Sequence, residues 1–175
     1  FTSTNRWRGS WEKIQLNGGL NTFQYCTVKY SNWGLYINNQ SNNTIDHCAF
    51  DSCVNSGLYA ASSNRIDGAC NITNSSFTNM ISRGLGIVNG RADISNILTQ
   101  GGQQGLMAAN SLVYLDHSTV QYNTSRGIYI SGSGSNVFLC NKDFSPAVNQ
   151  FRNNAYGEIY ITSSGWAYIG EYDAV

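Results

Sequence analysis

The chain has 175 residues and a mass of 19.2 kDa, which is the size of a single domain. Only 11% of the residues are charged and the formal net charge is +0, so the chain lacks the basic surface that a nucleic-acid-binding protein needs. A hydrophobic content of 41% can fill a core and argues against an acidic disordered tail, and no apolar run is long enough to span a membrane.

Uncharged polar residues take the place of the missing charge. The sequence holds 22 Asn, 21 Ser and 18 Gly residues. These residues favour turns and disfavour helix interiors, so the composition predicts many short strands joined by tight turns. Such a composition is typical of secreted and surface proteins, and we expect an extracellular location.

In chain order, the first predicted element is a repeated unit that begins at Asn21. Asn21–Val28 leads to Trp33–Ile37, and Asn43–Phe50 leads to Ser56–Ala60 with the same pattern. The second half of this unit returns at residues 84–87, 105–108 and 127–130, and more loosely at 157–161. Counted from Gly34, its glycines are spaced by 23, 27, 21, 22 and 30 residues. A regular return of this kind predicts a repeat architecture.

Aligned copies give columns of mostly apolar or small residues. The columns are Phe23, Ile45, Ile72, Ile94 and Leu115; Cys26, Cys48, Ser75, Ile97 and Ser118; Val28, Phe50, Phe77, Thr99 and Val120; Leu35, Leu58, Leu85, Leu106 and Ile128; and Ile37, Ala60, Ile87, Ala108 and Ile130. We interpret each copy as two short strands with alternating inward and outward side chains. Such a pair cannot bury its face alone, so the copies must stack as a solenoid of six or seven coils, about 4.8 Å apart.

Glycine and asparagine mark the corners of this predicted coil. A glycine precedes each Leu or Ile strand, where a corner requires either positive φ or close approach of two backbones. Five residues later stand Asn39, Ser62, Asn89, Asn110 and Gly132, which are common in turns. A leucine-rich repeat would need leucines that are missing here, and a β-sandwich would not explain the aligned columns.

The pattern N-T-[IF]-x-[YH]-C-x-[VF] followed by G-[LI]-[YGM]-[IA] resembles the repeats of right-handed parallel β-helix proteins with the pectate-lyase-like fold. The resemblance covers residues 11–170 and implies an all-β, right-handed parallel β-helix with coils of 21–27 residues. Because this fold carries lyases, hydrolases, adhesins and phage spikes, it does not specify a function. Residues 167–173 resemble the start of another coil, so we expect residues 1–175 to be one domain cut from a longer solenoid.

The weak candidates for catalysis are two Asp-His pairs and one further aspartate. Asp46-His47 resembles the I-D-H stretch of pectate lyases, and Asp116-His117 occupies the same repeat position three coils later, about 14 Å away. Glycosidase carboxyl groups lie about 5–9.5 Å apart, so these two aspartates are too distant to act together. Asp51 could share a cleft with Asp46. The alternative is that all these residues are outward polar positions in repeated strands.

The candidates for ligand binding lie on one outward column and at the corners. They are Tyr36, Tyr59, Tyr129, Tyr160, Arg83 and Arg126. The tyrosine rings could stack on sugars and the arginines could hold an acidic sugar. The alternatives are aromatic packing between neighbouring strands, an interface with another chain, and arginines that only bond nearby turns.

Five cysteines is an odd number, so at least one thiol is unpaired within the chain. Cys26 and Cys48 fall in one inward column and are expected to pack as free thiols. Cys53 and Cys70 flank an insertion and could form a disulfide. We expect no metal and no cofactor.

The leading functional hypothesis is a non-catalytic extracellular module, such as a rigid stalk, an adhesin or a filament segment. The alternative is a domain that binds or degrades polysaccharide, as a lyase or a hydrolase. The expected partners are polysaccharide, identical subunits or the adjacent coils of a longer chain, and neither nucleic acid nor a membrane.

Overall fold

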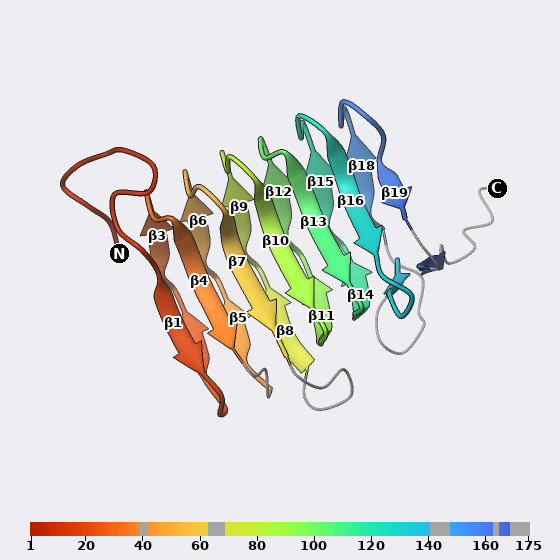
Figure 1. The fold of residues 1–175 in the computed structure, drawn as a ribbon, viewed down its shortest axis with the longest axis horizontal. Coiled ribbons are helices and arrows are strands. Elements are labelled where there is room, and N and C mark those ends of the chain that lie inside the picture. The colour runs from red at the N-terminus through yellow and green to blue at the C-terminus, as the bar shows by residue number, and fades with distance from the viewer. Residues whose placement is uncertain (39–41, 63–68, 141–147, 163–164, 169–175) are drawn as a thin grey trace.

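The computed structural model describes residues 1–38, 42–62, 69–140, 148–162 and 165–168. These residues form twenty strands and no helix, so none of them belongs to a helix that could cross a membrane. The strands follow one another along a single stack from the N-terminal to the C-terminal end (Figure 1). The predicted all-β, right-handed parallel β-helix is confirmed.

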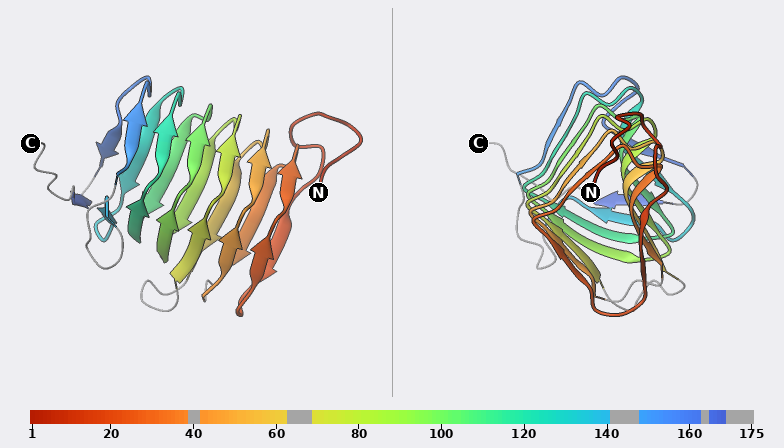
Figure 2. Two further views of the ribbon diagram at one scale, coloured as in Figure 1. Left: turned by 180° about the vertical axis from the view of Figure 1, so that it is seen from behind. Right: turned by 90° about the vertical axis from the view of Figure 1, so that its left-hand side faces the viewer.

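Three parallel sheets form the sides of the stack, and within each sheet a strand pairs with its counterparts on the neighbouring coils. The first sheet contains β1 (Ile14–Asn17), β4 (Trp33–Asn38), β7 (Ser56–Ala61), β10 (Arg83–Val88), β13 (Gln104–Ala109), β16 (Arg126–Ser131) and β19 (Ile159–Ile161). The second contains β2 (Thr22–Gln24), β5 (Thr44–Asp46), β8 (Ala69–Thr73), β11 (Arg91–Ser95), β14 (Leu112–Asp116), β17 (Asn136–Phe138) and β20 (Trp166–Tyr168). The third contains β3 (Thr27–Lys29), β6 (Ala49–Asp51), β9 (Ser76–Thr78), β12 (Leu98–Gln100), β15 (Thr119–Gln121) and β18 (Gln150–Arg152). Viewed along the stack, successive coils lie behind one another (Figure 2, right).

Each complete coil has three strands, whereas the sequence predicted two. The stretch read as a single strand, such as Asn43–Phe50, bends in the middle and gives one strand to the second sheet and one to the third. A residue with left-handed backbone makes this bend in five coils, with φ between 45° and 53° at Tyr25, His47, Asn74, Asn96 and His117. Because positive φ turns the chain sharply, one alternating segment becomes two short strands that face in different directions.

The inward columns read from the sequence stand in register in the structure. Phe23, Ile45, Ile72, Ile94 and Leu115 follow one another through the second sheet, and the Val28 and Leu35 columns do so in the third and first sheets. Most members are completely buried and form one continuous core. Two neighbouring members, Phe50 and Phe77, stack with their ring centres 5.0 Å apart and their planes 3° apart.

The corner glycines from Gly34 to Gly127 are required for close approach and not for positive φ, whereas Gly157 of the looser last copy has a φ of 117° and no atom within 4 Å of an added Cβ. A Cβ added to Gly34 would lie 2.2 Å from the carbonyl oxygen of Gly57, and one added to Gly105 would lie 2.8 Å from that of Gly127. Positive φ instead occurs in the predicted turn column, at Asn89, Asn110 and Gly132. Asn39 of that column lies outside the described residues.

Candidate functional site

An open groove of about 760 Å³ follows the bend between the second and third sheets. Its polar lining includes His47, Asn74, Asn96, His117, Thr119 and Arg152, from five successive coils. The side chains of the two histidines are 48% and 60% exposed. The groove therefore offers amides, imidazoles, a hydroxyl and a guanidinium along the axis of the solenoid.

Four residues with left-handed backbone line this groove: His47, Asn74, Asn96 and His117. Asn96 donates to the Asn74 side chain at 2.7 Å, and the ring of Tyr25 stacks on that of His47 at 5.0 Å. Asparagine tolerates left-handed backbone better than most residues, because its short polar side chain can bond locally. The bend thus places one side chain per coil in a row along the groove.

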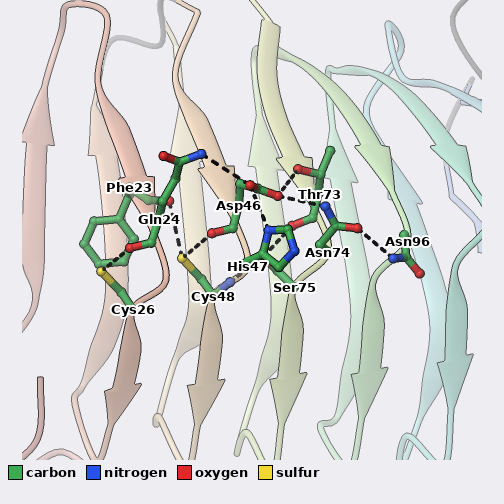
Figure 3. A network of polar contacts seen from close by, with 10 residues as sticks. All are labelled: Phe23, Gln24, Cys26, Asp46, His47, Cys48, Thr73, Asn74, Ser75 and Asn96. Carbon is green, nitrogen blue, oxygen red and sulfur yellow. Dashed lines mark hydrogen bonds and ion pairs between the residues drawn. The ribbon is translucent and has the colours of Figure 1, made fainter.

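Asp46 is the centre of the hydrogen-bond network at this bend (Figure 3). Its carboxylate accepts hydrogen bonds from Thr73 Oγ1 at 2.7 Å and Asn74 Nδ2 at 2.9 Å, both on the next coil. His47 Nδ1 lies 2.8 Å from the same carboxylate. The hydrogen bond from Thr73, followed by those from His47 and Asn74, holds the pKa of Asp46 well below its usual range.

Asp51 repeats this arrangement at the following bend. It accepts hydrogen bonds from Thr78 Oγ1 at 3.1 Å and Asn79 Nδ2 at 2.8 Å on the next coil, and Lys29 Nζ lies 3.8 Å away. The sequence does contain a sign of this arrangement. The stretches I-D-H-C and F-D-S-C in one copy align with I-T-N-S and F-T-N-M in the next, so that each aspartate aligns with the threonine of a Thr-Asn pair. Sequence reasoning missed it because Asp51 and Asp46 were considered for one cleft, whereas Asp46 ends β5 and Asp51 ends β6, at two successive bends.

The second Asp-His pair stands in the same column as the first, three coils away. Asp46 pairs in register with Thr73, Thr73 with Ser95, and Ser95 with Asp116, so the two aspartates are three coils apart, as the sequence predicted. His117 Nδ1 lies 2.6 Å from the Asp116 carboxylate, so each imidazole turns one nitrogen toward its own aspartate. The structure therefore brings together the members of each pair and keeps the two pairs apart.

Each carboxylate in the described part of the chain contacts a neighbouring polar or basic side chain. Besides the three aspartates above, these contacts are Glu12 with Asn32, Asp93 with Arg91, and Glu158 with Asn154. Those same residues contain no group of three His, Cys, Asp or Glu side chains that could hold a metal ion. Every carboxylate of the described residues therefore has a side-chain partner within the solenoid.

Asp46→Asn is expected to remove part of the acid sensitivity of folding. A carboxylate whose pKa is lowered in the folded state stabilises that state above its unfolded pKa of about 3.9, and this contribution is lost as pH falls below that value. The urea midpoint of the native chain should therefore exceed that of the variant near neutral pH, and the difference should shrink toward pH 3. Glu12→Gln, at an exposed site, is the control. An unchanged difference across this pH range would contradict the role of Asp46.

The outward column of the first sheet forms a second surface, which we call the tyrosine strip: Tyr36, Tyr59, Gly86, Met107, Tyr129 and Tyr160. These residues stand in register on successive coils, including Tyr160 of the looser last copy. Tyr36 stacks on Tyr59 at 5.2 Å and Tyr129 on Tyr160 at 6.0 Å. The Tyr59 ring also covers Gly86, where an added Cβ would lie 2.8 Å from Tyr59 Cδ2. The rings therefore cover much of one another's faces.

The two candidate arginines pack along the same strip. Arg126 lies 3.9 Å from the ring centre of Tyr160 and 5.1 Å from that of Tyr129, which are cation–π distances. Arg83 Nη1 lies 3.0 Å from Met107 Sδ, and burial lowers the pKa of Arg83. The arginines are two coils apart, as predicted, since both stand in register with Gln104 of the coil between them.

All five cysteines are free, so the hypothesis of a Cys53–Cys70 disulfide is wrong. The Cys53 thiol lies 3.0 Å from Ser31 Oγ, and Cys70 stands beside Ala92 in the second sheet. Cys26 and Cys48 occupy one column on the first two complete coils, as expected.

The fold and its surfaces define a three-sheeted parallel β-solenoid with a polar groove at one bend and a tyrosine strip on another side. The family model described as a right handed beta helix region matches residues 2–100, which is more than half of the chain. The chain therefore belongs to the right-handed β-helix family. Comparison with curated proteins and with solved structures gave no match.

Proposed function

We propose that the chain is a non-catalytic extracellular module, a rigid stalk, adhesin or filament segment that presents its polar sides to other surfaces. The observation that carries this proposal is the use of the carboxylates. Asp46 and Asp51 each bind a Thr-Asn pair on the next coil, and so act as bonds between coils. Because these carboxylates bond one coil to the next, they help to hold the coils together, which suits a module that carries mechanical load or displays a surface.

Rigidity is the property that supports such a role. Three parallel sheets run through the stack, and their inward columns form one core. Each coil is held by its two neighbours through backbone hydrogen bonds and buried apolar area, as in other solenoids. A low charge and an excess of Asn and Ser on the outward positions agree with an extracellular surface.

The test measures both cleavage of polysaccharide by the chain and adhesion of cells that display it. On a panel of neutral and uronate polysaccharides, the chain is expected to release no new reducing ends and no unsaturated products. Bacteria displaying the chain should be retained under flow on glycan-coated surfaces, or on surfaces coated with the chain itself, more than bacteria displaying an unrelated domain of equal size. Cleavage that Asp46→Asn or Asp116→Asn abolishes would contradict the non-catalytic proposal.

The polar groove favours a second candidate, binding of polysaccharide without cleavage. Its lining side chains recur once per coil, so a chain of sugars lying along the axis could bond to several coils at once. His117→Ala and Arg152→Ala are then expected to weaken glycan binding about tenfold each, since a typical hydrogen bond contributes about 0.5–1.5 kcal/mol and one to a charged group such as the Arg152 guanidinium contributes about 1.5–3 kcal/mol. Tyr59→Ala and Tyr129→Ala are the matched variants on the other surface. If these alone abolish binding, the tyrosine strip and not the groove holds the glycan.

A further inference from the structure

Two thiols stand one above the other at the inner side of the bend between the second and third sheets. Cys26 follows β2 and Cys48 follows β5, and the residues on both sides of them pair in register, Gln24 with Asp46 and Thr27 with Ala49. The amide of Ala49 also donates to the carbonyl oxygen of Cys26 at 2.8 Å. The two cysteines therefore occupy the same place in successive coils.

The two thiols also have the same orientation. Cys26 Sγ donates to the carbonyl oxygen of Gln24 at 3.1 Å, and Cys48 Sγ lies 3.2 Å from that of Asp46, in each case two residues back along the chain. Cys48 Sγ also lies 3.3 Å from the carbonyl oxygen of Phe23 on the preceding coil. Figure 3 shows both sulfurs pointing in the same direction from their strands. Side chains with one orientation on stacked coils are separated by the coil spacing, about 4.8 Å.

That spacing decides what the pair can hold. A disulfide requires sulfurs about 2.05 Å apart, so the present orientation does not permit one. A thiolate–metal bond is about 2.3 Å long, and two such bonds in line span about 4.6 Å. The separation of the stacked thiols thus matches a single ion placed between them.

We propose that Cys26 and Cys48 form a two-coordinate site for a soft monovalent cation of the copper(I) class, which links the first two complete coils. On binding, each thiol releases one proton and both sulfurs bond to the ion. The bridge carries one net negative charge and no electron is transferred. Cys26 is partly exposed while Cys48 is only 3% exposed, so the ion enters past Cys26.

The number of ligands sets the selectivity. The described residues offer no third His, Cys, Asp or Glu side chain to such a group. Zinc takes four ligands in structural sites, whereas thiolates select copper(I) among soft ions. Zinc is therefore expected to compete poorly.

The column itself supplies a substitution that keeps the fold. Ser75 and Ser118 occupy the same position in later coils, and their hydroxyls make the same bond to the carbonyl two residues back, each at 2.7 Å. Cys26→Ser and Cys48→Ser therefore preserve the local hydrogen bond and remove only the sulfur. Cys53→Ser and Cys70→Ser are the controls, because these thiols stand beside Ser31 and Ala92.

The experiment is an anaerobic titration of the reduced 175-residue chain with copper(I), supplied as its acetonitrile complex against a chromophoric chelator. We expect one tightly bound ion per chain, an affinity about 100-fold lower in Cys26→Ser and Cys48→Ser, and no change in the two controls. X-ray absorption at the copper edge should show two sulfur neighbours, and excess zinc should not displace the ion.

Three results would overturn the proposal. One is an unchanged affinity in Cys26→Ser or Cys48→Ser, and another is a copper spectrum with three or more sulfur neighbours. The third is a Cys26–Cys48 disulfide in chain purified without reductant, because it would show that the two sulfurs are not held apart. None of these results bears on whether the chain acts as an extracellular module, so the two proposals are tested separately.

Discussion

Gly34→Ala is expected to destabilise the chain by about 3 kcal/mol, at the upper end of the range for inserting atoms into a packed interior. The new methyl group would lie 2.2 Å from the carbonyl oxygen of Gly57 and 2.9 Å from Phe50 Cδ1. The carbonyl cannot move away freely, because β4 and β7 are joined along their length by parallel pairing. The measurement is the free energy of unfolding in urea.

Gly86→Ala is the matched control, within the same sheet. There the new methyl group would meet the side chains of Tyr59 and Arg83, which can rotate outward. Alanine is also favoured over glycine in a strand by about 0.5–1 kcal/mol. We therefore expect a change of less than about 1 kcal/mol. Equal losses at Gly34 and Gly86 would show that backbone approach is not the reason for the glycine column.

Phe77→Ala is expected to cost about 4 kcal/mol, the usual loss for a large buried aromatic side chain. Phe77 is completely buried, stacks on Phe50, and would touch any Cβ placed on Gly57 at 2.8 Å. Its removal leaves a cavity where two coils meet, and the regular strand spacing prevents the coils from closing over it. The unfolding free energy and the protease sensitivity of the neighbouring coils report this loss.

Tyr156→Ala is the control for loss of an aromatic ring at an exposed position, since Tyr156 is 76% exposed. It should change stability by less than about 0.5 kcal/mol. If Phe77→Ala does not fold at all, Phe77→Leu should still fold with an intermediate loss. A Phe77→Leu variant as stable as the native chain would contradict the importance of the stacked pair.

The repeat pattern predicted the architecture, because stacking makes residues one copy apart into neighbours. Leu35, Leu58 and Leu85 were aligned from their glycines alone, and they stand in register in the first sheet. The same alignment placed Tyr160 beside Tyr129 and put three coils between Asp46 and Asp116. In a solenoid, sequence distance converts directly into spatial distance, and so these positions could be calculated from spacing.

The division of each coil into three strands could not be read in the same way. His47 and Asn74 look like ordinary outward residues within an alternating segment, yet their left-handed backbone bends the chain there. Positive φ is uncommon for a histidine, and nothing in the local pattern of apolar residues marks it. The groove was missed for the same reason, because it exists only where the bend occurs.

Side-chain partners were the other feature that required the structure. The sequence offered Asp46 and His47 as candidates for chemistry, and the structure shows the same carboxylate bound to Thr73 and Asn74, 27 and 28 residues away. The alignment puts these residues on adjacent coils but does not say which way their side chains turn. That direction depends on the bend, and it makes Asp46 a bond between coils.

The amino-acid sequence by itself determined the repeat, the register and the inward columns, because a shift of register would move the buried apolar residues out of their stacked columns. Only the tertiary structure decided the bends, the groove, the partners of the carboxylates and the parallel orientation of Cys26 and Cys48. Which residues are buried follows from their position in the repeat, and the repeat can be read from the order of residues along the chain. Hydrogen-bond geometry belongs to pairs of residues, and it is fixed only when two coils lie against each other.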